Sequence, residues 1–123
     1  MIKREELFAI SQIKGIGKVA INRLLKISND VDSIRNLSND ELSKCIKGRF
    51  KTEAINNLKT NFENYLSDAE YKIESMSETG IQVISRFDDI YPELYKQITD
   101  PPLFIYVKGN KELLNYQKNI AIV

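Results

Sequence analysis

GIQVISRFDDIYPELYKQITDPPLFIYVKG, residues 80–109, marks the point at which the pattern of this chain changes. IQVIS (81–85) and LFIYVKG (103–109) are short and apolar, with many β-branched and aromatic side chains, which predicts two strands. The connection between them predicts a turn and a short helix, with Pro92 in the first turn of that helix. NIAIV (119–123) predicts a third strand, and its continuous apolar run is typical of a parallel strand covered on both faces.

Before Gly80 the apolar residues recur at three- and four-residue intervals, which predicts amphipathic helices. Apolar residues at positions 7, 8, 10 and 13 lie close to a helical stripe. The next stripe consists of Val19, Ile21, Leu24, Leu25 and Ile27. A longer stripe over residues 52–76 predicts one long helix, or two helices broken near Ser67-Asp68. The first part of the chain is therefore predicted to be all-α.

Two local signals predict where helices begin and end. Ser38 and Glu41 are spaced as a capping box, which predicts a helix over residues 39–46. Gly80 is well placed to end the last helix in a left-handed conformation.

The motif Ile13-Lys-Gly-Ile-Gly-Lys-Val-Ala20 lies between two predicted helices and has the pattern of a helix-hairpin-helix. Gly15 and Gly17 would permit a tight turn with unusual φ, so a valine at position 17 would be strained. Ile16 would hold the turn in the core, and backbone amides at the start of the next helix would face a phosphate. The residues predicted to contact a DNA backbone here are Lys14, Gly15, Ile16, Gly17 and Lys18. The alternative is a helical hairpin that needs a tight turn for packing alone.

A second copy of the motif follows. Ile13-Lys14-Gly15 and Ala20-Ile21-Asn22-Arg23-Leu24 parallel Ile46-Lys47-Gly48 and Ala54-Ile55-Asn56-Asn57-Leu58. The second copy is one residue longer and has Phe50 in place of the second glycine. It predicts a tandem pair of hairpins, with further DNA-backbone contacts from Gly48, Arg49 and Lys51. Chance repetition in a chain rich in Ile, Lys and Asn is the alternative.

Composition excludes several kinds of site. The chain has no histidine and one cysteine, Cys45, so histidine-based catalysis and a histidine or cysteine zinc site are excluded. Asp88-Asp89 is expected to form a solvated or capping turn rather than a catalytic pair. No catalytic residue, metal or cofactor is predicted. The apolar runs are too short to cross a membrane, and a cytoplasmic protein is expected.

Charge divides unevenly along the chain. Residues 1–60 hold 12 Lys and Arg against 7 Asp and Glu, whereas residues 61–123 hold 6 against 10. A basic first half suggests a module that faces an anion, next to one that does not. The predicted domains are residues 1–78 and residues 79–123.

The second domain resembles the entry into the core of the DNA-processing protein A (DprA/Smf) family. The resemblance rests on the order and spacing of Gly80-Ile-Gln-Val-Ile84, Tyr91-Pro92-Glu-Leu94, Ile98-Thr-Asp-Pro-Pro102, Leu103-Phe-Ile-Tyr-Val-Lys-Gly109 and Asn119-Ile-Ala-Ile-Val123. The prolines of these motifs are expected to shape connections rather than bind a ligand.

The resemblance implies an α+β chain: a helix-hairpin-helix, SAM-like bundle followed by the first strands of a truncated Rossmann-like α/β domain. It implies a non-enzymatic protein that binds single-stranded DNA, forms homo-oligomers and helps to load the RecA recombinase during natural transformation. The family's DNA-contacting loop follows the strand that here ends at Val123, so no residue of that loop is carried over. The alternatives are a protein-interaction module whose hairpins do not bind DNA and a nucleotide-binding Rossmann-like protein.

Overall fold

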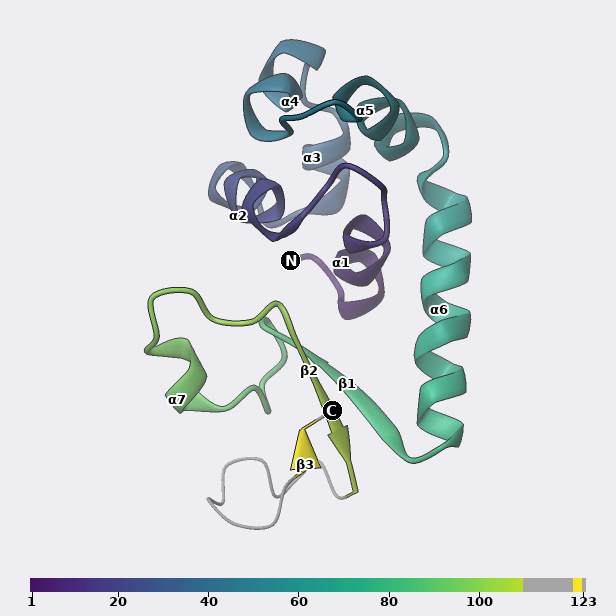
Figure 1. Ribbon diagram of the computed structural model, residues 1–123, viewed down its shortest axis with the longest axis vertical. Helices are drawn as coiled ribbons and strands as arrows, with labels where there is room; N and C mark the ends of the chain where they lie inside the picture. Colours follow the sequence, from purple (N-terminus) through teal and green to yellow (C-terminus); the bar gives the residue numbers. More distant parts are fainter. Residues whose placement is uncertain (110–120, 123) are drawn as a thin grey trace. The chain divides into compact units, whose positions relative to one another are not determined.

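The computed structural model describes residues 1–109 and 121–122, which form helices followed by a small antiparallel sheet (Figure 1). The helices are α1 (Arg4–Ser11), α2 (Lys18–Ile27), α3 (Val31–Arg35), α4 (Asn39–Cys45), α5 (Lys51–Thr60), α6 (Phe62–Glu78) and α7 (Glu93–Lys96), and the strands are β1 (Ile81–Ser85), β2 (Phe104–Lys108) and β3 (Ala121–Ile122). The chain divides into two compact units, Met1–Ala69 and Glu70–Val123, and α6 runs from one into the other.

Side-chain caps fix the starts of α3 and α4. The Ser38 hydroxyl accepts from the Glu41 amide at 3.1 Å, and Glu41 reaches back to the Ser38 amide, which confirms the predicted capping box. α3 was not predicted, because it is too short to show periodicity. The Asp30 carboxylate accepts from the Ser33 amide at its start, and hydrogen bonds from Ser33 lower the pKa of Asp30.

The long stripe over residues 52–76 forms two helices, and they separate at Asn61 rather than near Ser67-Asp68. The reason lies in α3. The Arg35 guanidinium donates to the carbonyl oxygens of Leu58 at 3.0 Å and Lys59 at 2.9 Å. In a continuous helix those oxygens would accept from amides four residues later, so Arg35 satisfies the end of α5 and allows the chain to turn.

The core of the first unit is built from the apolar faces of its helices. Its fully buried large side chains are Leu7, Ile10, Ile13, Ile21, Leu24, Ile34, Leu42, Ile46, Leu58 and Phe62. The predicted stripe of α2 is buried at Ile21 and Leu24, but Val19 and Ile27 are 62% and 49% exposed. A five-residue stripe is wider than the face that α2 buries.

Within the second unit, Gly80 follows the end of α6 and has φ 86°, the left-handed conformation that was predicted. β1 pairs antiparallel with β2, with Ile81 opposite Lys108, and β3 pairs antiparallel with β2. The prediction of a parallel strand at residues 119–123 is therefore wrong for its described part, Ala121–Ile122. An apolar run reports burial on both faces, whereas strand direction is set by the connection that leads into it.

The connection between β1 and β2 packs on the sheet through Tyr91. Its ring is fully buried, lies 6.1 Å from the Tyr95 ring in an edge-to-face arrangement, and its hydroxyl donates to the Pro102 carbonyl at 2.7 Å. The buried cluster of this unit contains Ile84, Tyr91, Ile105 and Val107. The hydrogen bond from Tyr91 to Pro102 thus joins the Tyr91-Pro92 motif to the Asp100-Pro101-Pro102 motif.

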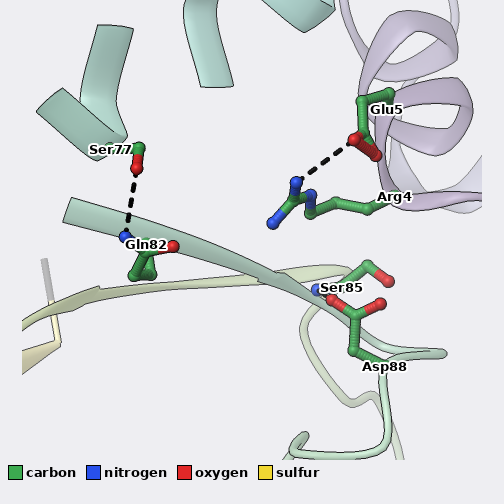
Figure 2. Close-up of polar contacts among 6 residues, drawn as sticks. All are labelled: Arg4, Glu5, Ser77, Gln82, Ser85 and Asp88. Carbon is green, nitrogen blue, oxygen red and sulfur yellow. Dashed lines mark hydrogen bonds and ion pairs between the residues drawn. The ribbon is translucent and has the colours of Figure 1, made fainter. Parts of the chain in front are cut away.

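Polar contacts fix both ends of β1 (Figure 2). At its start, the Gln82 amide nitrogen donates to the Ser77 hydroxyl of α6 at 3.2 Å. At its end, the Asp88 carboxylate accepts from the Ser85 amide at 2.8 Å. Asp88 therefore caps a turn, as the sequence predicts for this acidic pair.

Candidate functional site

The first turn, residues 13–17, joins α1 to α2. The Ile16 amide donates to the Ile13 carbonyl at 3.0 Å, and Gly15 between them has φ 99°. This is the third position of a tight turn that favours glycine, because a side chain at positive φ meets its own backbone. Ile16 is 3% exposed and holds the turn in the core, as predicted.

Gly17 differs from the prediction. Its φ is −97° and its ψ is −175°, an extended conformation that any residue adopts, and no atom lies within 4 Å of the position of a Cβ. The expectation that a valine at position 17 would be strained is therefore wrong. Of the two glycines, only Gly15 has the positive φ that this tight turn requires. Gly17 is the exposed N-cap residue of α2.

The second turn, residues 46–50, joins α4 to α5 and also contains a glycine at positive φ, but its hydrogen bond runs from the Lys51 amide to the Gly48 carbonyl at 3.3 Å. Gly48 has φ 105°, close to the value at Gly15. The positions paired by the sequence repeat are buried in both copies: Ile13 and Ile46, Ala20 and Ala54, Ile21 and Ile55, Leu24 and Leu58. The two helix pairs therefore place corresponding residues in corresponding environments.

The two turns lie against each other, and together they are called the paired turns. A Cβ on Gly15 would lie 3.0 Å from the Phe50 Cβ and 3.2 Å from the Ala54 Cβ. The Lys14 ammonium lies 4.1 Å from the centre of the Phe50 ring, and the Arg49 guanidinium carbon lies 5.2 Å from it. Phe50 thus holds a cation from each turn.

Sequence reasoning did not include Phe50 among the site residues. The available signal was its place in the repeat, where it replaces the second glycine. A half-buried aromatic ring at a turn needs a surface to pack on, and the missing side chain of Gly15 supplies that surface. The arrangement also links α2 and α4, where the Arg23 guanidinium donates to the Cys45 carbonyl at 3.3 Å.

Each turn leads into a ten-residue helix whose N-cap residue, Gly17 or Phe50, has no polar side chain to cap it. α3 and α4, in contrast, are capped by Asp30 and Ser38. The first amides of a helix have no partner within the helix and carry partial positive charge. The starts of α2 and α5 are therefore suited to an anion.

Charge around the paired turns is mostly positive, although Glu53 lies in the first turn of α5. Residues 13–26 and residues 44–51 each contain four basic side chains and no acidic one. Of the predicted contact residues, Lys14, Gly17, Gly48 and Arg49 are exposed, Gly15, Lys18 and Lys51 are half-buried, and Ile16 is buried. The contact between Gly15 and Phe50 brings the two predicted sets next to each other.

Other kinds of site find little support in the part of the chain that the structure describes. Residues 1–109 and 121–122 contain no group of three or more Cys, Asp or Glu side chains placed to hold a metal ion. Among the same residues, no helix has the length and apolar character that crossing a membrane requires.

Comparison with known proteins bears on the second unit. No curated protein and no solved structure matches the chain. Residues 82–123 match the family described as DNA recombination-mediator protein A. The matched segment contains β1 from Gln82 onward, the buried Tyr91, the Pro102 carbonyl that it binds, and β2. Over this segment the chain is similar to the DNA recombination-mediator protein A family.

Proposed function

We propose that this protein binds single-stranded DNA as a non-enzymatic accessory factor in recombination, and that the paired turns contact the DNA backbone. The observation that carries the proposal is the contact between Gly15 and Phe50, which brings two basic turns and two uncapped helix starts together. The family match supplies the recombination context.

In this proposal the two helix pairs act as helix-hairpin-helix units. Backbone amides at the starts of α2 and α5 donate hydrogen bonds to phosphate oxygens, because a helix N-terminus favours an anion. Lys14, Lys18, Arg49 and Lys51 add charge at the same surface. Contacts of this kind position a protein on the backbone and carry no base specificity. We therefore expect binding that does not depend on sequence.

The rest of the proposal follows from the family resemblance. The second unit would be part of a Rossmann-like α/β domain, and the protein would form homo-oligomers and load the RecA recombinase onto single-stranded DNA during natural transformation. Such a role places it in the cytoplasm, where the DNA is.

A second candidate function is a packing role for the paired turns without DNA. Phe50 favours it, since an aromatic ring fills the space beside Gly15 and occupies the Lys14 ammonium. In that case the helix pairs would support a partner-binding surface elsewhere. The two functions differ in whether the amides of the turns respond to DNA.

The test is a chemical-shift titration of the full chain with a short single-stranded oligonucleotide at low and high salt. We expect shifts at residues 14–20 and 47–52 and a dissociation constant of about 10⁻⁴ M, as for non-specific binding. Lys18→Glu should remove these shifts. Because an acidic residue in the first turn of a helix is favourable, this variant should remain folded.

Lys72→Glu is the matched control, since it makes the same change in net charge at an exposed residue of α6. It should bind as the unmodified protein does. An absence of shifts at low salt, or equal losses in both variants, would contradict backbone binding at the paired turns and favour the packing role.

A further inference from the structure

A groove runs between α4 and α5, next to the paired turns. Its volume is about 350 Å³, and residues from both helices line it. Ile55, 8% exposed, is its apolar component, and Ser43 and Asn56 contribute a hydroxyl and an amide. Lys51 and Lys59 also line it, and the lining side chains, all from the described helices, include no carboxylate.

The four-residue spacing of residues on α5 explains why both lysines line the groove. Lys51, Ile55 and Lys59 follow each other at intervals of four residues, so they lie on one face of the helix. The backbone positions of the two lysines are about 12 Å apart along the helix axis. Both lysines are half-buried, which is expected when the aliphatic stem lies along the protein and the ammonium faces solvent.

The groove is continuous with the proposed DNA surface through Lys51. This residue is the first of α5 and immediately follows Phe50 in the second turn. A strand whose phosphate lies at the start of α5 would therefore have the groove, and then Lys59, along its path.

The lining groups fit a nucleotide better than an isolated anion. Two cations separated by an apolar side chain suit a polyanion whose charged groups alternate with flat apolar rings. Ser43 and Asn56 offer donors and acceptors to a base edge or a sugar hydroxyl. The volume of about 350 Å³ lies at the lower end of the range for small-molecule sites, which suits one unpaired nucleotide.

We propose that this groove binds a nucleotide of the same single strand that contacts the paired turns. The inference rests on the proposed function and adds a subsite to it. Lys51 and Lys59 hold successive phosphates, and the base lies between them over Ile55. The groove thereby makes the surface selective for unpaired nucleic acid, because a base can enter it only when it is not stacked and paired in a duplex.

The experiment compares a trinucleotide with a dodecanucleotide of thymidine, using the full chain and fluorescence anisotropy at several salt concentrations. Lys59→Gln should weaken binding of the dodecanucleotide severalfold and make its salt dependence shallower by about 0.7, the value for one phosphate contact on a single strand. Binding of the trinucleotide should change less. Lys72→Gln is the control of equal charge and should leave both unchanged.

A second variant tests the groove without changing charge. Asn56 is exposed on α5, and Asn56→Trp would fill the groove while leaving the paired turns intact. It should weaken the dodecanucleotide as Lys59→Gln does, with an unchanged circular dichroism spectrum. If both variants bind the dodecanucleotide as the unmodified protein does, while Lys18→Glu binds weakly, the groove proposal is overturned and backbone binding stands. If the unmodified protein binds neither oligonucleotide, both proposals fall.

Discussion

Gly15→Ala and Gly17→Ala make the same chemical change two residues apart, and the structure predicts opposite outcomes. At Gly15 the new methyl group would lie 3.0 Å from the Phe50 Cβ, 3.1 Å from the Phe50 carbonyl oxygen and 3.2 Å from the Ala54 Cβ. The first two are backbone or near-backbone atoms that cannot rotate away. At Gly17 no atom lies within 4 Å.

Two costs add at position 15. An alanine at φ 99° would be in a region that costs a residue with a side chain about 1–2 kcal/mol. Forcing a methyl group into an occupied space costs about 1–3 kcal/mol more. Alanine also restricts the unfolded chain, which offsets about 0.4–1 kcal/mol, so we expect Gly15→Ala to lower the free energy of unfolding by about 1–4.5 kcal/mol.

Gly17→Ala should change the free energy of unfolding by less than about 1 kcal/mol. Alanine is a poorer N-cap residue than glycine, but it restricts the unfolded chain, which favours folding by about 0.4–1 kcal/mol. The two effects have opposite signs, and neither involves a contact.

The assay is urea unfolding of the full chain followed by far-ultraviolet circular dichroism, with thermal unfolding as a second measurement. A loss of about 2 kcal/mol lowers the melting temperature of a small domain by about 8 °C or more. Equal stabilities for the two variants, or greater damage from Gly17→Ala, would refute the assignment of the tight turn to Gly15 and its packing on Phe50.

Two other contacts give predictions. Arg35→Met should lower the free energy of unfolding by about 2 kcal/mol or more, since it removes charged hydrogen bonds to the carbonyls of Leu58 and Lys59. Glu63→Gln breaks the 3.4 Å ion pair between Arg35 and an exposed carboxylate, and it should cost less than about 0.5 kcal/mol in the same urea titration. Tyr91→Phe should cost about 1–2 kcal/mol by removing the buried hydrogen bond to Pro102. Burial raises the pKa of Tyr91 in the folded chain, so its stabilising effect is present below the unfolded value of about 10 and is lost as the pH rises toward the folded value. When unfolding is measured from neutral to alkaline pH, Tyr91→Phe should lose less unfolding free energy at alkaline pH than the unmodified protein does. The loss that remains in this variant includes the contribution of Tyr106, because burial raises the pKa of that residue too. An unchanged pH profile would contradict this assignment.

Local signals in the sequence determined much of this structure. The capping box at Ser38, the left-handed Gly80, the strand at 81–85 and the anchoring of Ile16 were all predictable, because each depends on neighbours within a few residues. The repeat also identified corresponding positions in the two helix pairs. The family signature lies in the same category, since order and spacing carry it.

Tertiary structure decided the features that depend on distant partners. The helix break lies at Asn61 because Arg35, more than twenty residues earlier, donates hydrogen bonds to the carbonyl oxygens of Leu58 and Lys59. The apolar run at 119–123 suggested a parallel strand, but its described residues, Ala121–Ile122, pair antiparallel with β2. Periodicity reports burial and cannot report such long-range pairing.

The same distinction applies to the candidate site. Both basic turns were predicted from the sequence. Only the tertiary structure shows that Phe50 lies against Gly15 and that a cation from each turn lies against the Phe50 ring. It also separates two glycines that look alike in sequence: Gly15 has positive φ and a neighbour at contact distance, whereas Gly17 is extended and open. Which glycine is required depends on the backbone angles and the neighbouring helix, and neither is encoded in the local motif.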